Sequence, residues 1–412
     1  MERALLVTLK IKGRRGAWLA EERSMELAEL ARSSGAGVAE EIIVVREKPS
    51  PALFIGSGKA GEIAGICEEK KIKVVIFNND LTPTQQKNLE DIINVKTLDR
   101  TQLILDIFAG RARSNEGKIQ VELAQLLYLL PRLTGKGVIL SRLGGGIGTR
   151  GPGEQKLEVD RRKINDRIFK LKKDLERLSV QRLTRRKQRT RFALLTVALI
   201  GYTNSGKSTL LNALTDSDVI TRDRLFSTLD PTVRSLILPN NQKVLVADTV
   251  GFLNELPHHL IESFKATLEE VVNADVLIHL IDISHPKARE MENAVYDVLK
   301  ELGASDKKII TVLNKRDMID PADIERRARE FRNAIPISAF KRQNFEALLD
   351  RLIFCLNGIV KAYELVLPQE KARLISLIHD RGNVLEKEYR GNDVYIKAEL
   401  PIKLYERIKK DL

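Results

Sequence analysis

The eight residues from Gly201 to Ser208, GYTNSGKS, satisfy the pattern G-x-x-x-x-G-K-[ST] at the end of the apolar run LTVALIG. Glycines at the first and sixth positions let the backbone wrap around phosphate groups, so that successive N–H groups point at the anion. Lys207 would neutralise the β- and γ-phosphates, and the Ser208 hydroxyl would ligate Mg²⁺. This phrase predicts a nucleotide site made of Gly201, Tyr202, Thr203, Asn204, Ser205, Gly206, Lys207, Ser208 and Thr209.

A second phrase, DTVG at residues 248–251, follows the apolar run KVLVA. The Asp248 carboxylate can hold Mg²⁺ through water, and the backbone N–H of Gly251 can turn toward the γ-phosphate, with Thr249 and Val250 in the same predicted contact. The next residue, Phe252, stands where many nucleotide hydrolases have a side chain that orders the attacking water. A phenyl ring can neither orient nor deprotonate water, so no catalytic side chain is assigned, and only Lys207 and the Gly251 backbone assist.

The phrase FSTLDPT at residues 226–232 lies between these two motifs and supplies threonines for a nucleotide-sensing switch. We choose Thr228 as the residue that contacts Mg²⁺ and the γ-phosphate, with Thr232 second, since spacing alone does not separate them. The predicted nucleotide contacts in this phrase are Phe226, Ser227, Thr228, Leu229 and Asp230.

A base-reading phrase, Asn314-Lys315-Arg316-Asp317, ends the hydrophobic run KIITVLN. A carboxylate at Asp317 can accept hydrogen bonds from N1–H and the exocyclic amino group of guanine. Adenine lacks this donor pair, so Asp317 predicts GTP over ATP. The later phrase IPISAF places Ser338, Ala339 and Phe340 for further contacts with the base.

Three other patterns have competing interpretations. Asn204 could hold K⁺ where an arginine finger would place its charge, or could only make a hydrogen bond that stabilises the loop. FIGSGKAGEIA at residues 54–64 resembles half a phosphate loop, but Ala60 replaces the hydroxyl residue, which favours a tight turn that opens a helix. His258 and His259 follow Pro257, and a structural role at a helix start is favoured over catalysis.

Positive charge is concentrated in one segment. The chain has 69 basic and 56 acidic residues, a net charge of +13, and fifteen Lys/Arg against five Asp/Glu fall between Lys156 and Arg191. Concentrated positive charge attracts polyanions and releases their counterions, so nucleic acid or an acidic membrane is the predicted partner class. A solvated helical face without a partner is the alternative.

Composition predicts a soluble protein of a reducing cytoplasm. The two cysteines, Cys67 and Cys355, suggest no disulfide framework, and they show no metal-ligand spacing with the five histidines. No apolar run approaches the roughly 20 residues that span a bilayer. We expect the chain to act as a monomer without stable membrane association.

Alternating apolar and helical segments predict an α/β fold in four parts. We expect an N-terminal α/β domain (1–112), a basic helical arm with a Gly-rich loop (113–192), a P-loop nucleotide-binding domain (193–360) and a small α+β domain (361–412). In the arm, a helix over 117–131, limited by Pro131, precedes a long basic helix. The second helix has apolar residues at a/d spacing, which predicts antiparallel packing of the two. These apolar residues are Leu157, Ile164, Ile168, Leu171, Leu175 and Leu178.

The chain resembles the HflX GTPases over roughly residues 1 to 360. The phrases that carry the resemblance are GSGKAGEIA, DRTQLILDIFAGRARSNEGKIQVELAQLLYLLPRL, LGGGIGTRGPGEQKLEVDRRKI, FSTLDPTVR and DTVGFLNELPHHLIESFKATLEE, in that order. Ser205, where the family usually has Ala, and Phe340, where Lys, Arg or Leu is usual, are departures. The departure at Phe340 leaves open how this segment contacts the base.

The resemblance implies GTP hydrolysis with Ser208 and Thr228 as Mg²⁺ ligands, binding to the large ribosomal subunit, and splitting or rescue of stalled ribosomes. It also places the chain among GTPases in which a hydrophobic residue replaces the water-positioning Gln. We therefore expect slow intrinsic turnover, on the order of 10⁻⁴ to 10⁻² per second, that the ribosome stimulates. The role of the C-terminal module is not implied.

The basic arm then gains a predicted role in contacting rRNA phosphates. The candidates at or just after the Gly-rich loop are Arg150, Lys156, Arg161, Arg162 and Lys163. Competing interpretations are an ATP-dependent RNA-remodelling enzyme, a membrane-surface GTPase, and a ribosome-bound module that binds GTP without turnover. Asp317 argues against the first, and the apolar stripe of the basic helix, which fits helix pairing, argues against the second.

Overall fold

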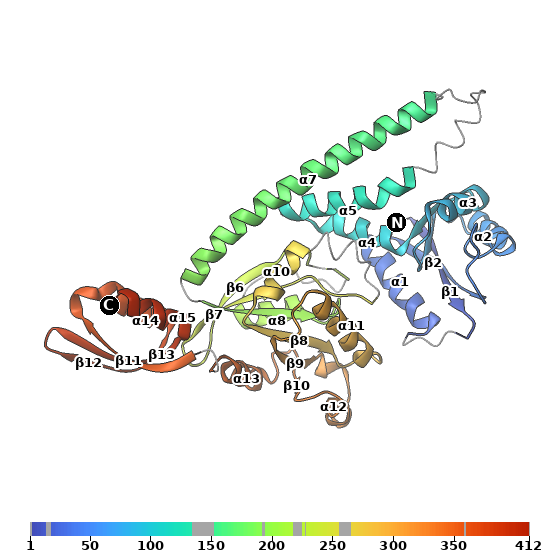
Figure 1. The fold of residues 1–412 in the computed structure, drawn as a ribbon. Helices are drawn as coiled ribbons and strands as arrows, with labels where there is room; N and C mark the ends of the chain where they lie inside the picture. Colours follow the sequence, from blue (N-terminus) through green and yellow to red (C-terminus); the bar gives the residue numbers. More distant parts are fainter. Residues whose placement is uncertain are drawn as a thin grey trace. The chain divides into compact units, whose positions relative to one another are not determined.

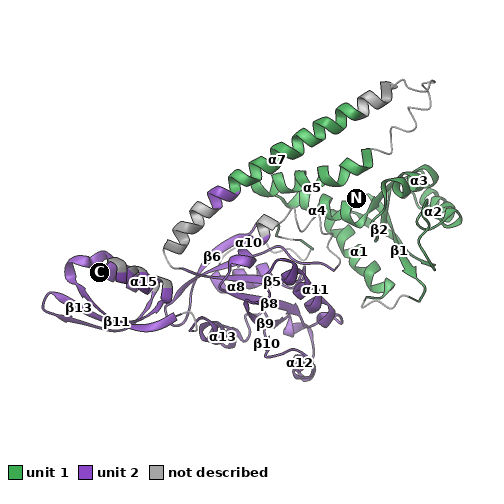
Figure 2. Ribbon diagram, in the orientation of Figure 1, with its two compact units in different colours: residues 1–178, 224–229, 257–264 green, residues 179–223, 230–256, 265–412 purple. Residues whose placement is uncertain are grey.

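The computed structural model describes residues 2–13, 18–133, 152–191, 194–216, 225–226, 228–254, 265–357 and 360–411. The chain forms two compact units (Figure 2). Unit 1 comprises residues 1–178, 224–229 and 257–264, and unit 2 comprises residues 179–223, 230–256 and 265–412. No helix among the described residues is long and apolar enough to cross a membrane.

Unit 1 begins with a parallel four-stranded sheet in the order β2-β1-β3-β4 (Figure 1). Its strands are β1 (Arg3–Ile11), β2 (Gly37–Arg46), β3 (Val74–Phe77) and β4 (Lys96–Asp99), and its helices are α1 (Ala20–Ser34), α2 (Ser57–Glu69), α3 (Pro83–Ile93) and α4 (Arg100–Arg111). Helix α1 packs against α4, and α2 packs against α3. The expected N-terminal α/β fold is therefore confirmed. The GSGK phrase opens α2, with Gly56 at a positive φ of 85° before the first helical residue, which fits the predicted tight turn.

Two paired helices follow, α5 (Asn115–Leu133) and α7 (Pro152–Arg191). Leu123 of α5 packs with Ile168 and Leu171 of α7 in a buried cluster, and the Arg167 guanidinium binds both carboxylate oxygens of Glu122 at 2.6 and 2.7 Å. The helices run antiparallel (Figure 1), as the a/d spacing predicts. Pro131 does not end α5 as expected, since the helix continues to Leu133. The boundary between the units falls within α7 after Leu178, and the four-part division of the chain stays a prediction.

A partly buried ion pair anchors α5 to the first sheet. Arg132 of α5 donates to the Asp99 carboxylate at the end of β4 at 2.9 Å, and its guanidinium lies 3.4 Å from the ring centroid of Tyr128. Asp99 also caps α4 by accepting from the backbone N–H of Gln102 at 2.9 Å. Burial raises the pKa of Asp99. One carboxylate thus fixes the start of α4 and the end of α5.

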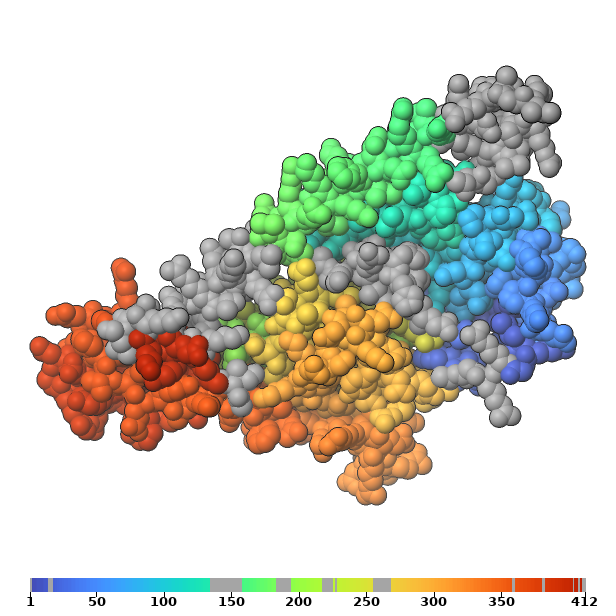
Figure 3. Space-filling model, viewed as in Figure 1, coloured from blue at the N-terminus to red at the C-terminus, as the bar shows by residue number. Residues whose placement is uncertain are grey.

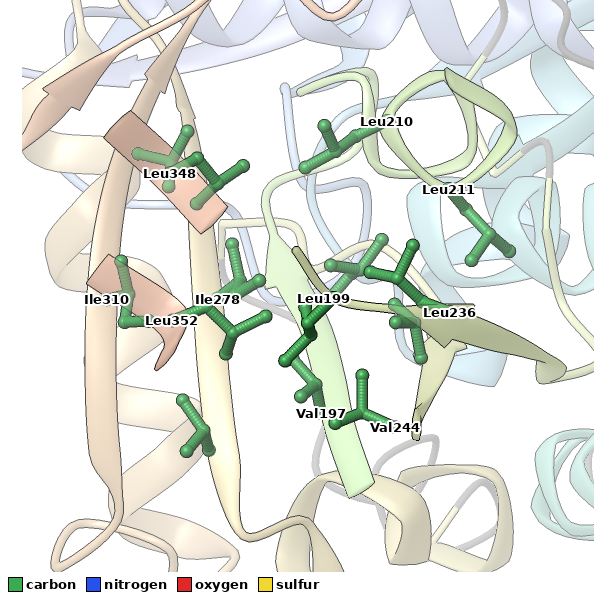
Figure 4. Close-up of a cluster of buried hydrophobic side chains, with 14 of the residues drawn as sticks. Val197, Leu199, Leu210, Leu211, Leu236, Val244, Ile278, Ile310, Leu348 and Leu352 are labelled. Carbon is green, nitrogen blue, oxygen red and sulfur yellow. The ribbon is translucent and has the colours of Figure 1, made fainter. Parts of the chain in front are cut away.

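Unit 2 contains a six-stranded sheet in the order β10-β9-β8-β5-β7-β6, parallel except for β6. The strands are β5 (Leu195–Gly201), β6 (Thr232–Ile237), β7 (Lys243–Asp248), β8 (Val276–Asp282), β9 (Lys308–Asn314) and β10 (Ile335–Pro336). The helices are α8 (Lys207–Thr215), α10 (Lys265–Asn273), α11 (Ala288–Glu301), α12 (Pro321–Ala328) and α13 (Phe345–Asn357). Leu210 and Leu211 of α8, with Leu348 and Leu352 of α13, join the sheet residues Leu199 and Ile278 in one core (Figure 4).

A small α+β module ends the chain. Strands β11 (Val360–Pro368), β12 (Asn383–Arg390) and β13 (Asp393–Pro401) form an antiparallel sheet in the order β11-β13-β12, with helices α14 (Ala372–Arg381) and α15 (Ile402–Asp411). Its core joins Leu367, Ile396 and Leu400 to Ile378 and Ile408 of the two helices. The expected C-terminal α+β fold is confirmed.

Shortening Leu171 tests the packing between α5 and α7. Leu171 is 1% exposed within the cluster, and Leu171→Ala should destabilise the helix pair by about 2–5 kcal/mol because it leaves a cavity. Phe169 on the same helix is 71% exposed, and Phe169→Ala should change stability by less than about 0.5 kcal/mol. Hydrogen exchange of the α5 and α7 amides measures both effects. Equal loss of protection in the two variants would contradict the observed pairing.

Candidate functional site

The residues with predicted chemistry gather at the carboxyl ends of neighbouring parallel strands. Gly201 ends β5, Asp248 ends β7, Asp282 ends β8 and Asn314 ends β9, and the order β9-β8-β5-β7 brings these ends to one edge of the sheet. Ligands of open α/β sheets bind outside the carboxyl ends of the strands. The candidate site therefore lies at this edge of unit 2.

Two glycines of the P-loop stand where a side chain would collide. A Cβ on Gly201 would lie 2.3 Å from the Leu280 carbonyl oxygen. Gly206, the residue before α8, has a φ of +93°, and its Cβ would lie 2.2 Å from Nδ2 of Asn314. Glycine is required at Gly206 both by this conformation and by the close approach of Asn314.

Lys207 is buried inside the loop that precedes it. Its ammonium donates to the carbonyl oxygens of Gly201 at 3.1 Å and Tyr202 at 2.8 Å. Burial lowers the pKa of Lys207 to about 8, against the opposing effect of the Asp248 carboxylate. The ammonium is still charged at neutral pH, and a phosphate brought into the loop would stabilise that charge further.

Ser208 and Asp248 form a buried pair of oxygen ligands. The Ser208 hydroxyl donates to Oδ2 of Asp248 at 2.6 Å, and Thr249 beside it donates to the Leu199 carbonyl oxygen at 2.6 Å. A hydroxyl and a carboxylate are oxygen donors of the kind that Mg²⁺ prefers, so the pair fits this ion. No group of three or more His, Cys, Asp or Glu residues in the described part of the chain could hold a metal. An ion here would thus take its further oxygen ligands from other groups, such as a hydroxyl, water or phosphate.

Phe252 closes the backbone of the DTVG phrase onto the P-loop. Its N–H donates to the Gly201 carbonyl oxygen at 3.1 Å, and its own carbonyl oxygen accepts from the Thr203 N–H at 2.8 Å. The residue is 2% exposed, so its ring is packed in the interior. A Cβ on Gly251 would lie 2.8 Å from Cα of Thr203, which shows how closely the two segments approach. From the sequence, Phe252 is notable only because it lacks a group that could orient water. In the structure, its buried ring and its backbone hydrogen bonds hold the DTVG phrase against the P-loop.

The carboxamide of Asn314 joins the P-loop to the base-reading loops. Its Nδ2 donates to the Ser205 carbonyl oxygen at 2.8 Å, and its Oδ1 accepts from the Ala339 N–H at 2.9 Å. Asn314 is 2% exposed. One buried side chain thus connects three phrases that the sequence placed in the site by pattern alone.

The other base-side residues lie around this connection. Lys315 pairs with Asp282 at 2.7 Å, and the Ser338 hydroxyl oxygen accepts from the Lys341 N–H at 3.0 Å. Asp317 is half-buried in a short 3₁₀ helix (Arg316–Met318), and Phe340 is 81% exposed. The structure brings Asp317, Ser338 and Ala339 to one end of the sheet and leaves the Phe340 ring at the surface.

Part of the predicted switch belongs to unit 1. The Phe226 ring packs edge to face on Phe108 of α4 with centroids 4.6 Å apart, and the Leu225 N–H donates to the Ser33 hydroxyl oxygen at 3.0 Å. Thr228 and Leu229 fall in the same unit, whereas Asp230 and Thr232 fall in unit 2. The assignment of Thr228 as a Mg²⁺ ligand stays a prediction. Ser227, His258 and His259 lie outside the described residues.

His279 of β8 is a buried titratable residue that the sequence did not single out. Burial, with a smaller effect from the charge of Lys207, lowers the pKa of His279 to about 3, so the imidazole is neutral at physiological pH. Its ring lies edge to face against Tyr296 of α11, with centroids 5.5 Å apart. A single histidine within an apolar strand carries no pattern that predicts its neighbours.

Three stretches of the chain match known protein families. Residues 21–109 match the family described as GTP-binding GTPase N-terminal, and residues 111–189 match the GTP-binding GTPase Middle Region. Residues 196–315 match the family described as 50S ribosome-binding GTPase. GTPase HflX of Caldanaerobacter subterraneus subsp. tengcongensis is 46% identical over 391 residues, which cover 94% of this chain and 90% of that protein. The chain belongs to the HflX family of GTPases.

Further relatives agree with this family assignment. GTPase HflX of Escherichia coli K12 is 40% identical over 393 residues, covering 94% of this chain and 92% of that protein. The crystal structure of the complex of SsGBP with GDP aligns at a TM-score of 0.51 and 27% identity, covering 87% of this chain and 99% of that one. The P-loop GTPase fold of unit 2 is therefore shown by both sequence and structure.

Four of the five RNA-contact candidates of this HflX-family chain lie on α7. Arg161, Arg162 and Lys163 are exposed on the part of the helix that also packs on α5. The backbone of Lys156 lies in α7, but its side chain, like the whole of Arg150, is outside the described residues. The exposed cations therefore lie on the solvent side of α7, whose apolar side packs against α5.

Replacing Gly206 by alanine tests the packing of the P-loop. Gly206→Ala combines the strain of a positive φ with a collision against Asn314, and should cost more than about 2 kcal/mol. Gly303 also has a positive φ of 67°, but nothing lies within 4 Å of an added Cβ, so Gly303→Ala should cost only about 1 kcal/mol. The thermal unfolding midpoint compares the two. Equal shifts of the unfolding midpoint in the two variants would mean that the packing of Asn314 against the P-loop does not require glycine at position 206.

Proposed function

We propose that this chain is a Mg²⁺-dependent GTPase that binds the large ribosomal subunit and takes part in splitting or rescuing stalled ribosomes. The observation that carries the nucleotide part is the hydrogen-bonded connection that Asn314 makes from the Ser205 carbonyl oxygen of the P-loop to the Ala339 N–H of the base-reading loop. This connection holds a phosphate loop and a base-reading loop in one rigid arrangement. The distance between a nucleotide's phosphates and its base is thereby fixed by the protein.

The proposed nucleotide contacts follow from this arrangement. The P-loop N–H groups and Lys207 bind the phosphates, Ser208 and Asp248 hold Mg²⁺, and Asp317 accepts from guanine. Mg²⁺, when bound, would neutralise phosphate charge and polarise the γ-phosphate. The backbone of Gly251 lies next to Lys207, since an added Cβ would be 3.1 Å from the ammonium nitrogen. This proximity supports the proposal that the Gly251 N–H senses the γ-phosphate.

Intrinsic hydrolysis is proposed to be slow because no described side chain at the site replaces the water-orienting Gln. Phe252 is 2% exposed and its ring carries no hydrogen-bonding group. Asn204 has a φ of +62° in the P-loop, and its role as a K⁺ ligand remains a hypothesis. A turnover rate that does not change when Na⁺ replaces K⁺ would exclude it.

The ribosomal part of the proposal has separate support. Residues 196–315 match a family described as 50S ribosome-binding, and the exposed cations of α7 offer a surface for RNA phosphates. We propose that the chain acts as a monomer in the cytoplasm, where ribosomes are found. Thr228 would join Ser208 on Mg²⁺ in the GTP-bound state.

Nucleotide choice is tested by changing the proposed base reader. Asp317→Asn removes the charge that accepts from guanine, and each hydrogen bond to a charged group contributes about 1.5–3 kcal/mol. GDP binding, measured by titration calorimetry, should weaken about 10- to 100-fold. Asp320→Asn is the matched control, because Asp320 caps α12 and Asn caps as well. Unchanged affinity in Asp317→Asn would contradict the assignment.

The proposed RNA surface is tested by the salt dependence of ribosome binding. Replacing Arg161, Arg162 and Lys163 together by Gln should weaken binding to purified large subunits and lower the slope of log affinity against log salt by about two to three. The control replaces the exposed Lys170, Lys172 and Lys173 of the same helix by Gln. Equal effects in the two triple variants would assign binding to the overall charge of the helix instead of the segment next to the Gly-rich loop.

A further inference from the structure

A second cavity of unit 2 lies away from the predicted nucleotide site. Its volume is about 400 Å³, within the range of small-molecule sites, and it is formed by α11, β9, α13 and the residues before β10. Three arginines line it: Arg289 of α11, Arg332 before β10 and Arg351 of α13. None of its lining residues belongs to the P-loop, the DTVG phrase or the base-reading loops.

The charge in this cavity is unbalanced. Among the residues that the structure describes, Glu292 is the only acidic one that lines the cavity. It is 5% exposed and pairs with Arg289. Arg332 and Arg351 form no ion pair with any residue that the structure describes. Two positive charges therefore remain unpaired in the cavity. A phosphate dianion would balance both charges, whereas a single carboxylate would balance only one.

Two of the arginines lie within cation–π distance of an aromatic ring. The Arg289 guanidinium lies 5.5 Å from the ring centroid of Phe331, and that of Arg351 lies 5.2 Å from the ring centroid of Phe354. Guanidinium groups stack on aromatic faces and present a planar fork of donors that matches phosphate geometry. Side chains that are already oriented lose less entropy when an anion binds.

The edge of the sheet contributes backbone groups to the same cavity. Strand β10 pairs only with Val312 and Leu313 of β9, so residues 308–311 have no strand partner on that side within the described structure. The Leu313 carbonyl oxygen accepts from Ile337, which shows that its backbone groups face the β10 side. By alternation the groups of Ile309 and Thr311, both of which line the cavity, face the same way. Their N–H groups can add donors to those of the arginines.

We propose that this cavity binds a phosphate group, as free phosphate or as the terminal phosphate of an RNA. Arg332 and Arg351 supply the charge, Arg289 is oriented by Glu292 and Phe331, and the unpaired edge of β9 adds backbone donors. This inference does not rest on the proposed function, because the site shares no residue with the predicted nucleotide contacts. It gives unit 2 a second anion site beside β9, where the short edge strand β10 leaves part of β9 without a strand partner among the described residues.

The test is a titration of inorganic phosphate into the full chain with GDP and Mg²⁺ at saturation, so that the P-loop is occupied. The line width of the phosphorus resonance of free phosphate reports binding. Saturable broadening is expected in the parent chain, with affinity at least about tenfold weaker in R332Q/R351Q. The matched control is R326Q/R329Q, which removes the same charge from α12 and from the residue that follows it. Helix α12 stands out from the rest of unit 2 (Figure 3).

A second arm separates the two sources of phosphate. Short RNA oligonucleotides with and without a 5′-phosphate compete against inorganic phosphate under the same conditions. Stronger competition by the phosphorylated form points to an RNA end, and equal weak competition points to free phosphate; either result supports the site if R332Q/R351Q loses binding. The proposal is overturned if phosphate does not bind saturably, or if R326Q/R329Q weakens binding as much as R332Q/R351Q. GDP affinity, measured in parallel, should be the same in all three proteins, and failure of GDP binding alone would count against the nucleotide proposal only.

Discussion

The candidate site depends on one constraint, that a loop which binds phosphate must turn its carbonyl oxygens away from the anion. In this chain the Gly201 oxygen accepts from Lys207 and Phe252, the Tyr202 oxygen accepts from Lys207, and the Ser205 oxygen accepts from Asn314. These donors come from three separate segments, so the loop keeps its shape only when all three are in place. Among these oxygens, that of Ser205 has the Asn314 carboxamide as its one donor within the described residues, so losing Asn314 would leave a buried polar atom without this partner, at a cost of about 1–3 kcal/mol.

This constraint changes the interpretation of Phe252. Its backbone supplies one of the bonds that shape the P-loop, and its ring is buried, so the residue serves the architecture of the switch. A side chain that must pack in the interior cannot also reach a water molecule beside the γ-phosphate. In the proposed function, this packing accounts for slow intrinsic turnover, and a partner supplies or orders the missing catalytic group.

Local patterns in the sequence predicted much of the fold and the place of the site. Glycine spacing, apolar runs and turn chemistry marked the P-loop, and the a/d stripe predicted that Ile168 and Leu171 pack on α5. The bridge from Asn314 to Ser205 joins residues 109 positions apart, and the contact of Phe226 with Phe108 joins residues from different predicted domains. The arginine cavity likewise combines three elements and the loop before β10, between residues 289 and 351. Such contacts depend on which elements become neighbours after folding, which no local pattern records.

The measurement that tests the account most directly is GTP turnover by the purified chain alone, with saturating large ribosomal subunits, and with small subunits at the same concentration. The buried Phe252 predicts turnover on the order of 10⁻⁴ to 10⁻² per second for the chain alone. Large subunits should raise the rate by at least about tenfold, and small subunits should leave it unchanged. Fast turnover by the chain alone, or a rate that large subunits do not change, would contradict the claim that this switch waits for a partner.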